Sequence, residues 1–186
     1  LSQHNADRHS LLINPGGGMI GDVGGFVAAT FMRGISLVNV PTTLLAMVDA
    51  SSGGKNGINL SGLKNQVGTF TNPLAVCISP LFLKTLPPRD IRAGFGELIK
   101  HALIADLNYW KEIKAIRSLE NVDWNPLIAK SVQIKRQIVN ADFKEKNLRK
   151  TLNFGHTIGH ALESYSMKHH QDPLKHGEAV AAGMVT

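Results

Sequence analysis

The chain has one cysteine, few aromatic residues and no long apolar run, and each shortage excludes a class of protein. Cys77 alone cannot form an internal disulfide, and a single thiol suits a reducing cytoplasm. Its position in AVCIS predicts a small buried hydrophobe. No stretch approaches the roughly 20 apolar residues of a membrane helix, and the opening LSQHNADRHS lacks the layout of a signal peptide. We therefore expect a cytoplasmic protein with no membrane partner.

The charge is positive but not concentrated. The net charge is +6, the Lys and Arg residues are scattered, and aromatic residues make up only 6% of the chain. A nucleic-acid-binding face would gather its cations on one surface. We therefore expect no nucleic-acid partner, and we expect the cations to line a pocket for an anionic small molecule.

The length and the last residues bear on domain organisation. With 186 residues, 43% of them hydrophobic, the chain fits one ordinary globular domain or parts of two. It closes on HGEAVAAGMVT, a helical pattern with no stop signal. We expect a fragment of a longer protein.

Residues 1–86 have the alternating pattern of an α/β domain. Apolar strands are expected at 11–14, 35–41 and 74–80, and helices at 19–32 and 42–54. The Gly-, Asn- and Ser-rich stretch 55–70 predicts a loop. Strands that alternate with helices predict a Rossmann-like parallel sheet.

Residues 87–186 change to a helical pattern after Pro87-Pro88. Helical periodicity covers 90–104, 125–143, 157–168 and 177–185. We therefore expect a partial α/β domain at 1–86, followed by a partial all-α domain at 87–186.

The stretch NPGGGMIGD, residues 14–22, places glycines between a strand and a helix. Glycines there let a phosphate approach the open N–H groups of the helix N-terminus. The spacing GGGxxGD differs from the usual dinucleotide pattern. A tight turn with close helix packing explains the glycines equally well.

A second polar stretch is VPTTLLAMVDASSGGKNGIN, residues 40–59. Thr42 and Thr43 can donate hydroxyls to a ligand or cap the next helix. Asp49, beside the Ser/Gly turn, can hold a sugar hydroxyl or be a solvated helix residue. Lys64-Asn65 suits an oxyanion, although an exposed turn is the alternative.

The histidines of the helical half predict a metal or anion site. His156 and His160 lie four residues apart on one helical face, and His176 precedes a Gly-Glu pair. Glu97 in GFGELIK could complete the site, with Lys100 at i+3. Lys135, Arg149 and Asn153 are the further polar candidates, and the two cations could clamp an anion.

Six motifs in this order resemble the 3-dehydroquinate synthase family. They are GGGMIGDVGGFVAATFMRG, VPTTLLAMVDASSGGKNGIN, KNQVGTF, LPPRDIRAGFGELIK, LNFGHTIGHALE and HGEAVAAGM. Together they cover nearly the whole chain.

The resemblance implies an NAD-dependent enzyme of the shikimate pathway that contains Zn²⁺, or Co²⁺. Such an enzyme converts 3-deoxy-D-arabino-heptulosonate 7-phosphate into 3-dehydroquinate and phosphate. NAD transiently oxidises the C5 hydroxyl, phosphate is eliminated, the ketone is reduced back, and an intramolecular aldol reaction closes the ring. The anionic substrate would explain the basic charge.

The resemblance also implies roles for individual residues. The expected metal ligands are Glu97, His156 and His176, with His160 handling phosphate and protons. The other substrate-site residues are Asp49, Lys55, Asn65, Lys100, Lys135, Glu145, Arg149 and Asn153. Arg33 would serve the neighbouring subunit of a homodimer. The expected NAD contacts are Gly17, Gly18, Asp22, Thr42, Thr43, Lys64, Phe82, Thr85 and Leu86.

The chain departs from the family pattern at Asn56, where Thr is usual, and at Pro15. Other readings are a related sugar-phosphate cyclase, such as a 2-deoxy-scyllo-inosose or valiolone synthase, a metal-dependent polyol dehydrogenase, a basic nucleic-acid-binding module, or a non-catalytic remnant. Lys135, Arg149 and Asn153 favour a substrate with a carboxylate.

Overall fold

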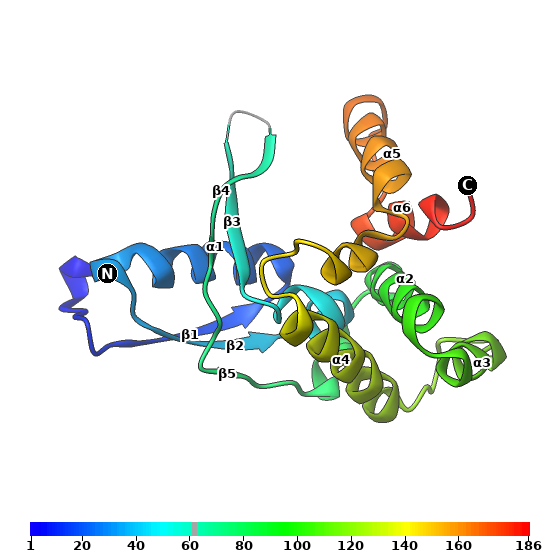
Figure 1. Cartoon of the computed structure of the whole chain (residues 1–186), viewed down its shortest axis with the longest axis horizontal. Helices are drawn as coiled ribbons and strands as arrows, with labels where there is room; N and C mark the ends of the chain where they lie inside the picture. The colour runs from blue at the N-terminus through cyan, green and yellow to red at the C-terminus, as the bar shows by residue number, and fades with distance from the viewer. Residues whose placement is uncertain (61–62) are drawn as a thin grey trace.

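The computed structural model describes the backbone of residues 1–60 and 63–186, and the side chains of 1–60 and 66–186. A small parallel sheet and its helix form one side of the molecule, and a group of helices forms the other (Figure 1). The predicted combination of an α/β part and a helical part is confirmed.

The parallel sheet has the strand order β1-β2-β5. Its strands are β1 (Leu11–Gly16), β2 (Ser36–Pro41) and β5 (Ala75–Val76). Helix α1 (Gly18–Thr30) returns from β1 to β2 and contacts both strands. A short 3-10 helix, η2 (Phe31–Arg33), follows α1.

The third strand is much shorter than the predicted 74–80, and Cys77 is exposed instead of buried. β5 is an edge strand, and its register with β2 covers only Val38↔Ala75 and Asn39↔Val76. Cys77 follows the last paired residue, and although its N–H still donates to the Asn39 carbonyl oxygen at 2.8 Å, its side chain is exposed.

The prediction of a loop at 55–70 was wrong. The segment forms an antiparallel hairpin of β3 (Lys55–Leu60) and β4 (Leu63–Phe70), which projects from the sheet in Figure 1. Its base packs on α1, where a Cβ on Gly25 would lie 2.0 Å from Asn56 Oδ1. The Asn56 amide donates to the Gly54 and Thr71 carbonyl oxygens at 3.1 and 3.0 Å. The unusual Asn56 therefore joins the two strands.

The helical half contains the predicted helices and two further elements. α2 (Pro88–Ala105), α4 (Trp124–Ala141), α5 (His156–His169) and α6 (His176–Gly183) match the periodic segments. The short helix α3 (Leu107–Ala115) and the 3-10 segment η5 (Leu148–Asn153) were not predicted. Asp106 is the N-cap of α3, and its carboxylate accepts a hydrogen bond from the Tyr109 N–H at 2.8 Å.

The main hydrophobic core joins the two parts of the chain. The predicted helix at 42–54 is shorter, running from 44 to 50 and ending in η3 (Ala46–Ala50), which has π-helical bonds. Leu44, Met47 and Val48 are buried against α2 and α4 residues, including Leu98 and Ile134. This packing fixes Asp49, the next residue, between the sheet and the helices. The domain boundary near 86–88 stays a prediction.

Candidate active site

Glycines let α2 and α6 approach backbone to backbone. A Cβ on Gly177 would lie only 1.8 Å from the Ala93 carbonyl oxygen, and one on Gly96 would lie 2.6 Å from the Gly177 carbonyl oxygen. Such distances exclude any side chain at these positions. Glu97 follows Gly96 in the chain and His176 precedes Gly177, so the close contact of the two glycines holds Glu97 and His176 opposite each other.

A second glycine contact joins α5 to α6. Gly155 has a positive φ of 78°, which favours glycine, and α5 begins at the next residue, His156. A Cβ on Gly183 would lie 2.2 Å from the Gly155 carbonyl oxygen. The glycines in NFGHTIGH and AAGM thus bring the first turn of α5 against α6.

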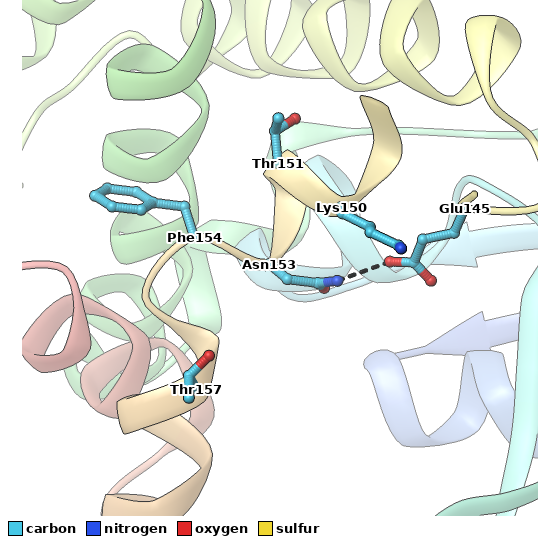
Figure 2. A pocket seen from close by; sticks show the side chains of 6 residues that line it. All are labelled: Glu145, Lys150, Thr151, Asn153, Phe154 and Thr157. Carbon is cyan, nitrogen blue, oxygen red and sulfur yellow. Dashed lines mark hydrogen bonds between the residues drawn. The ribbon is translucent and has the colours of Figure 1, made fainter. Parts of the chain in front are cut away.

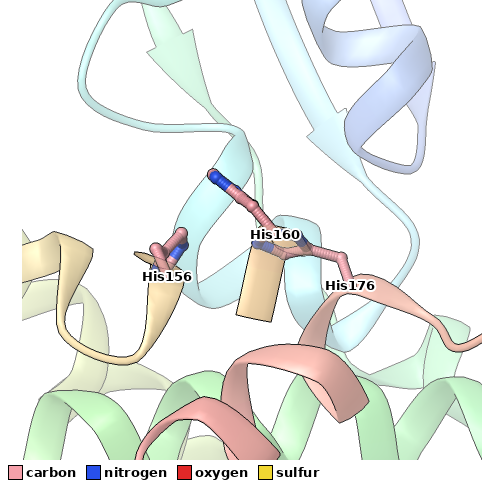
Figure 3. Close-up of side chains that lie close together, drawn as sticks. All are labelled: His156, His160 and His176. Carbon is pink, nitrogen blue, oxygen red and sulfur yellow. The ribbon is translucent and has the colours of Figure 1, made fainter. Parts of the chain in front are cut away.

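The three predicted histidines meet at this contact (Figure 3). The ring centroids of His156 and His160 are 5.2 Å apart, those of His156 and His176 are 5.1 Å apart, and those of His160 and His176 are 5.7 Å apart. One ring nitrogen from each lies within 4.8 Å of the others. Three imidazoles at such spacing can surround one divalent ion after small side-chain adjustments.

The outer nitrogens of two imidazoles face oxygen acceptors. His176 Nδ1 is 3.3 Å from Glu163 Oε2, and His156 Nδ1 is 3.3 Å from the Phe154 carbonyl oxygen. If these nitrogens carry the protons, each Nε2 keeps a lone pair for a metal. His176 Nε2 is 4.0 Å from Glu97 Oε1, a fully buried oxygen with no hydrogen-bond partner among the described residues. A buried carboxylate oxygen without a partner beside imidazole nitrogens fits a metal ligand set.

The two imidazoles have opposite pKa shifts. Burial and the nearby Lys100 ammonium lower the pKa of His156, so it is neutral and able to bind metal at physiological pH. Burial also acts to lower the pKa of His176, but the hydrogen bond that its Nδ1–H donates to Glu163 and the charge of Glu97 raise it above its ordinary value. A bound cation would oppose this protonation.

Arg89 anchors the segment that leads into His176. Its guanidinium donates to Glu178 Oε1 and Oε2, each at 2.8 Å, and to the Pro173 carbonyl oxygen at 2.8 Å. It also pairs with Asp172. These bonds tie the start of α2 to the start of α6 at four acceptors.

A buried row of alternating charges continues from Glu97 towards the sheet. Glu97 pairs with Lys100, and Asp49 Oδ1 lies 2.7 Å from Lys135 Nζ. Burial would raise the pKa of Asp49, but Lys135 and Lys100 hold it well below its usual range. Burial would lower the pKa of Lys100, but Asp49 and Glu97 raise it. Asp49, for which a solvated position was one alternative, is therefore an ionised, partly exposed member of a network whose other members are buried.

Asp49, Glu97 and His101 also have ligand atoms within 4.8 Å of one another. Two ammonium groups already neutralise the carboxylates, because Lys135 pairs with Asp49 and Lys100 with Glu97. A second cation at this point would be repelled by both. The charge distribution favours one metal, on the imidazole side of Glu97.

The outer rim of the site is a cavity of about 560 Å³ (Figure 2). Glu145 pairs there with Lys55 and accepts a hydrogen bond from Asn153 Nδ2 at 2.8 Å. Lys55 and Asn153 lower the pKa of Glu145 although partial burial acts to raise it. Two predicted site residues, Glu145 and Asn153, thus line this opening, and a third, Lys55, pairs with Glu145 from a distant part of the chain.

Arg149 is buried and already has backbone partners. Its guanidinium donates to the Gly53 carbonyl oxygen at 2.8 Å and to the Phe143 carbonyl oxygen at 2.6 Å. Burial lowers its pKa. A Cβ on Gly53, whose φ is 102°, would lie 2.9 Å from Arg149 Nη2 and 3.4 Å from Lys135 Cε. The SSGG turn therefore lies directly against both cations.

The glycine turn after β1 is an open helix N-terminus. Gly17 is the N-cap of α1 and has no capping side chain, so the first N–H groups of α1 remain available for an anion. Cβ atoms on Gly17 and Gly18 would lie 3.2 Å from Thr43 and from Ala50, respectively. Thr43 Oγ1 accepts from the Ala46 N–H at 3.2 Å, which is the predicted capping role. Burial and Asp49 raise the pKa of Asp22 to about 6.

The remaining predicted residues lie in or next to η4 (Pro80–Thr85), in η2 and in the hairpin. Phe82, Thr85 and Leu86 lie in or just after η4, which follows β5. Because β1, β2 and β5 are parallel, η4 starts from the same sheet edge as the glycine turn. Arg33 is exposed and has a positive φ of 70°. The side chains of Lys64 and Asn65 lie outside the described residues.

Two family models match the chain end to end. The one described as 3-dehydroquinate synthase N-terminal matches residues 1–93, and the one described as 3-dehydroquinate synthase C-terminal matches residues 94–186. The chain belongs to the 3-dehydroquinate synthase family.

Curated members of this family are similar along the whole chain. A 3-dehydroquinate synthase from Parabacteroides distasonis is 51% identical over 100% of this chain and 53% of its own length. One from Rippkaea orientalis is 47% identical over 98% of this chain and 51% of its own length. The chain spans about half the length of these relatives.

Solved structures show the same fold. A 2-deoxy-scyllo-inosose synthase matches with a TM-score of 0.82 and 32% identity over 99% of this chain and 51% of that one. A 2-epi-5-epi-valiolone synthase from Streptomyces hygroscopicus subsp. jinggangensis 5008, with NAD⁺ and Zn²⁺ bound, matches at 0.82 and 28% identity over 98% and 52%. A structure described as a probable glycerol dehydrogenase from Sinorhizobium meliloti 1021, with a TM-score of 0.58 and 19% identity, shares the fold alone.

In this member of the 3-dehydroquinate synthase family, several residues that contact the site were not predicted from the sequence. Glu163 faces His176, although its i+3 spacing from His160 could have drawn attention to it. Asn14 and Asn39 are buried and bonded to each other at 3.1 Å, and Asn39 Nδ2 donates to the Ser51 carbonyl oxygen at 3.1 Å. They connect the glycine turn to the end of η3.

Proposed function

We propose that this chain forms the catalytic centre of a 3-dehydroquinate synthase. The reaction converts 3-deoxy-D-arabino-heptulosonate 7-phosphate into 3-dehydroquinate and inorganic phosphate, with no net oxidation. The observation that carries the proposal is Glu97 Oε1, which has no hydrogen-bond partner in the described part of the chain and lies beside the imidazole cluster, next to buried cations that can receive an anionic substrate. The similarity to curated synthases supports it.

Glu97, His156 and His176 would hold the divalent ion, with Glu163 orienting His176. A bound Zn²⁺ or Co²⁺ would supply Lewis acidity to a substrate hydroxyl. His160 lies in the same cluster but is more exposed than the other two, which suits contact with a substrate phosphate and transfer of a proton.

The cations around the SSGG turn would hold the anionic groups of the substrate. Lys135 and Arg149 converge on Gly53, and Lys55 and Asn153 lie at the open rim with Glu145. Lys135 is buried, and burial lowers its pKa although Asp49 raises it. Asp49 and Lys100 would orient hydroxyl groups of the substrate. A partner of opposite charge already holds each of them in place, Lys135 for Asp49 and Glu97 for Lys100. Asn65 is proposed from its motif alone.

The glycine turn would bind NAD, which takes up and returns a hydride within each turnover. The uncapped N-terminus of α1 at Gly17 and Gly18 suits its pyrophosphate, and Asp22, Thr42 and Thr43 lie beside this turn. Lys64, Phe82, Thr85 and Leu86 are proposed as further contacts from the motifs.

We also propose a cytoplasmic homodimer in which Arg33 reaches the neighbouring site. The exposure of Arg33 supports the second part. Among the described helices, none combines the length and the apolar character that crossing a bilayer requires.

The test uses the full-length protein with NAD, Zn²⁺ and 3-deoxy-D-arabino-heptulosonate 7-phosphate, and follows phosphate and 3-dehydroquinate together. We expect equal amounts of both products without accumulated NADH, and loss of both after chelation or in Glu97→Gln. Glu120→Gln, the same change at an exposed position between α3 and α4, is the matched control. A folded, zinc-loaded protein that releases no phosphate would refute the proposal, and hexose phosphates would then test the related cyclase activities.

A further inference from the structure

A buried polar connection links α4, α2 and η3 behind the proposed substrate site. Along this connection, Ser131 on α4 contacts His101 on α2, and His101 faces Asp49 in η3. Ser131 and His101 are fully buried. Ser131 Oγ lies 2.5 Å from His101 Nδ1. The other ring nitrogen, His101 Nε2, lies 3.8 Å from Asp49 Oδ1 and has no hydrogen-bond partner among the described residues.

The chemistry of the two neighbours determines which nitrogen of His101 carries the proton. The Asp49 carboxylate is ionised and can only accept a hydrogen bond, whereas the Ser131 hydroxyl can donate or accept. A lone pair on Nε2 facing a carboxylate would be repelled, and Nε2 is itself buried from solvent. With Nε2 as the donor directed at Asp49, Nδ1 is the acceptor and the Ser131 hydroxyl donates to it.

We infer that His101 is a positioning residue that holds the Asp49 carboxylate in its working orientation. Lys135 Nζ, at 2.7 Å, and His101 Nε2 approach the same oxygen, Oδ1. This leaves Oδ2 to accept a hydroxyl from a ligand. The 3.8 Å separation between His101 Nε2 and Asp49 Oδ1 is longer than a hydrogen bond, and a small shift of η3 would shorten it to hydrogen-bond length. Contacts of this kind often tighten when ligand binds.

The same geometry excludes a hydrolytic role for the Ser-His-Asp sequence. Ser131 has no exposed surface, so its hydroxyl cannot reach a substrate. His101 is also fully buried, and the site residue that its Nε2 faces is Asp49. Both residues act on the chemistry through the orientation of the carboxylate. The effect on turnover rests on the proposed function, whereas the effect on the Asp49 orientation does not.

The test compares His101→Phe and His101→Gln in the full-length protein. Phe keeps the ring volume and removes both nitrogens, whereas Gln places an amide donor near the position of Nε2. Misplacing a catalytic group by about 1 Å can cost on the order of 100-fold in rate. We expect His101→Phe to lower kcat by about 10- to 100-fold with little change in the KM for NAD, and His101→Gln to recover most of that loss.

A core substitution controls for loss of stability. Ile128→Val removes a buried methylene from α4 in the same helical core and should leave kcat unchanged. Equal kcat losses in Phe, Gln and Val variants matched for thermal stability would overturn the inference, as would an unchanged kcat in a folded His101→Phe. If His101→Phe does not fold, Ser131→Ala and His101→Gln provide the same comparison.

A crystal structure of the His101→Phe variant separates this inference from the proposed function. A rotated Asp49 carboxylate would support the positioning role even if the wild-type protein made no 3-dehydroquinate. An Asp49 side chain unchanged in orientation and in its Lys135 contact would refute the role even in an active synthase.

Discussion

Replacing Gly177 with alanine should separate α2 from α6 and weaken metal binding. The new Cβ would start 1.8 Å from the Ala93 carbonyl oxygen, far below the 3.0 Å that real Cβ atoms reach, and the obstacle is backbone. α6 must therefore move away by more than 1 Å, taking His176 with it. Overpacking of this kind costs about 1–3 kcal/mol of stability, which outweighs the roughly 1 kcal/mol that alanine gains over glycine in a helix.

The matched control is Gly21→Ala on α1. A Cβ there would meet no atom within 4 Å, so only the helix propensity changes, and stability should rise by about 0.5–1 kcal/mol. Urea unfolding measures both effects, and competition with a chromophoric chelator measures Zn²⁺ affinity. We expect Gly177→Ala to lose stability and bind Zn²⁺ at least ten-fold more weakly. If it matched Gly21→Ala in both assays, the proposed close contact of α2 and α6 would be wrong.

Three further predictions concern the surroundings of the site. Glu163→Gln should weaken Zn²⁺ binding by about 10- to 100-fold, measured by the same competition, and an unchanged affinity would show that Glu163 does not orient His176. Because the pKa of Asp22 is raised from 3.8 to about 6 in the folded protein, the stabilising effect of its neutral form is complete below about pH 4 and is lost as the pH rises through 6. Asp22→Asn should remove that part of the pH dependence of urea unfolding, and an identical profile would contradict the shift. Arg89→Lys cannot keep the two-oxygen contact with Glu178 and should lower both the thermal midpoint and Zn²⁺ affinity, whereas Arg92→Lys, exposed on the same helix, should change neither.

Local patterns predicted the elements whose structure is decided locally. The strands at β1 and β2 and the four longer helices follow from their periodicity, and the histidine spacing placed His156 and His160 on one face. The residues alone left the type of site open between metal and anion. The resemblance to the 3-dehydroquinate synthase family selected Glu97 and set His160 apart, and the grouping of all three imidazoles does not decide that point.

Long-range contacts account for what sequence reasoning missed. Gly and Asn residues in 55–70 are typical of loops, but their pairing as a hairpin depends on the contact of Asn56 with Gly25. Glu163 and His101 were on predicted helices, yet nothing in their periodicity identifies the residues that face them from α6, α4 and η3. Cys77 was expected to be buried because its neighbours are apolar, and its exposure depends on where β5 leaves the sheet.

Helix α2 carries Glu97, Lys100 and His101 within little more than one turn, and each side chain serves a different neighbour. An error in the rotation or height of this one helix would displace all three together, so the metal side, the position of the Lys100 charge near Asp49 and the support of Asp49 do not vary independently. Screens that score site variants one residue at a time would record three separate defects. A single substitution that moves α2 as a rigid body should reproduce them all at once, and one that restores its packing should correct them all.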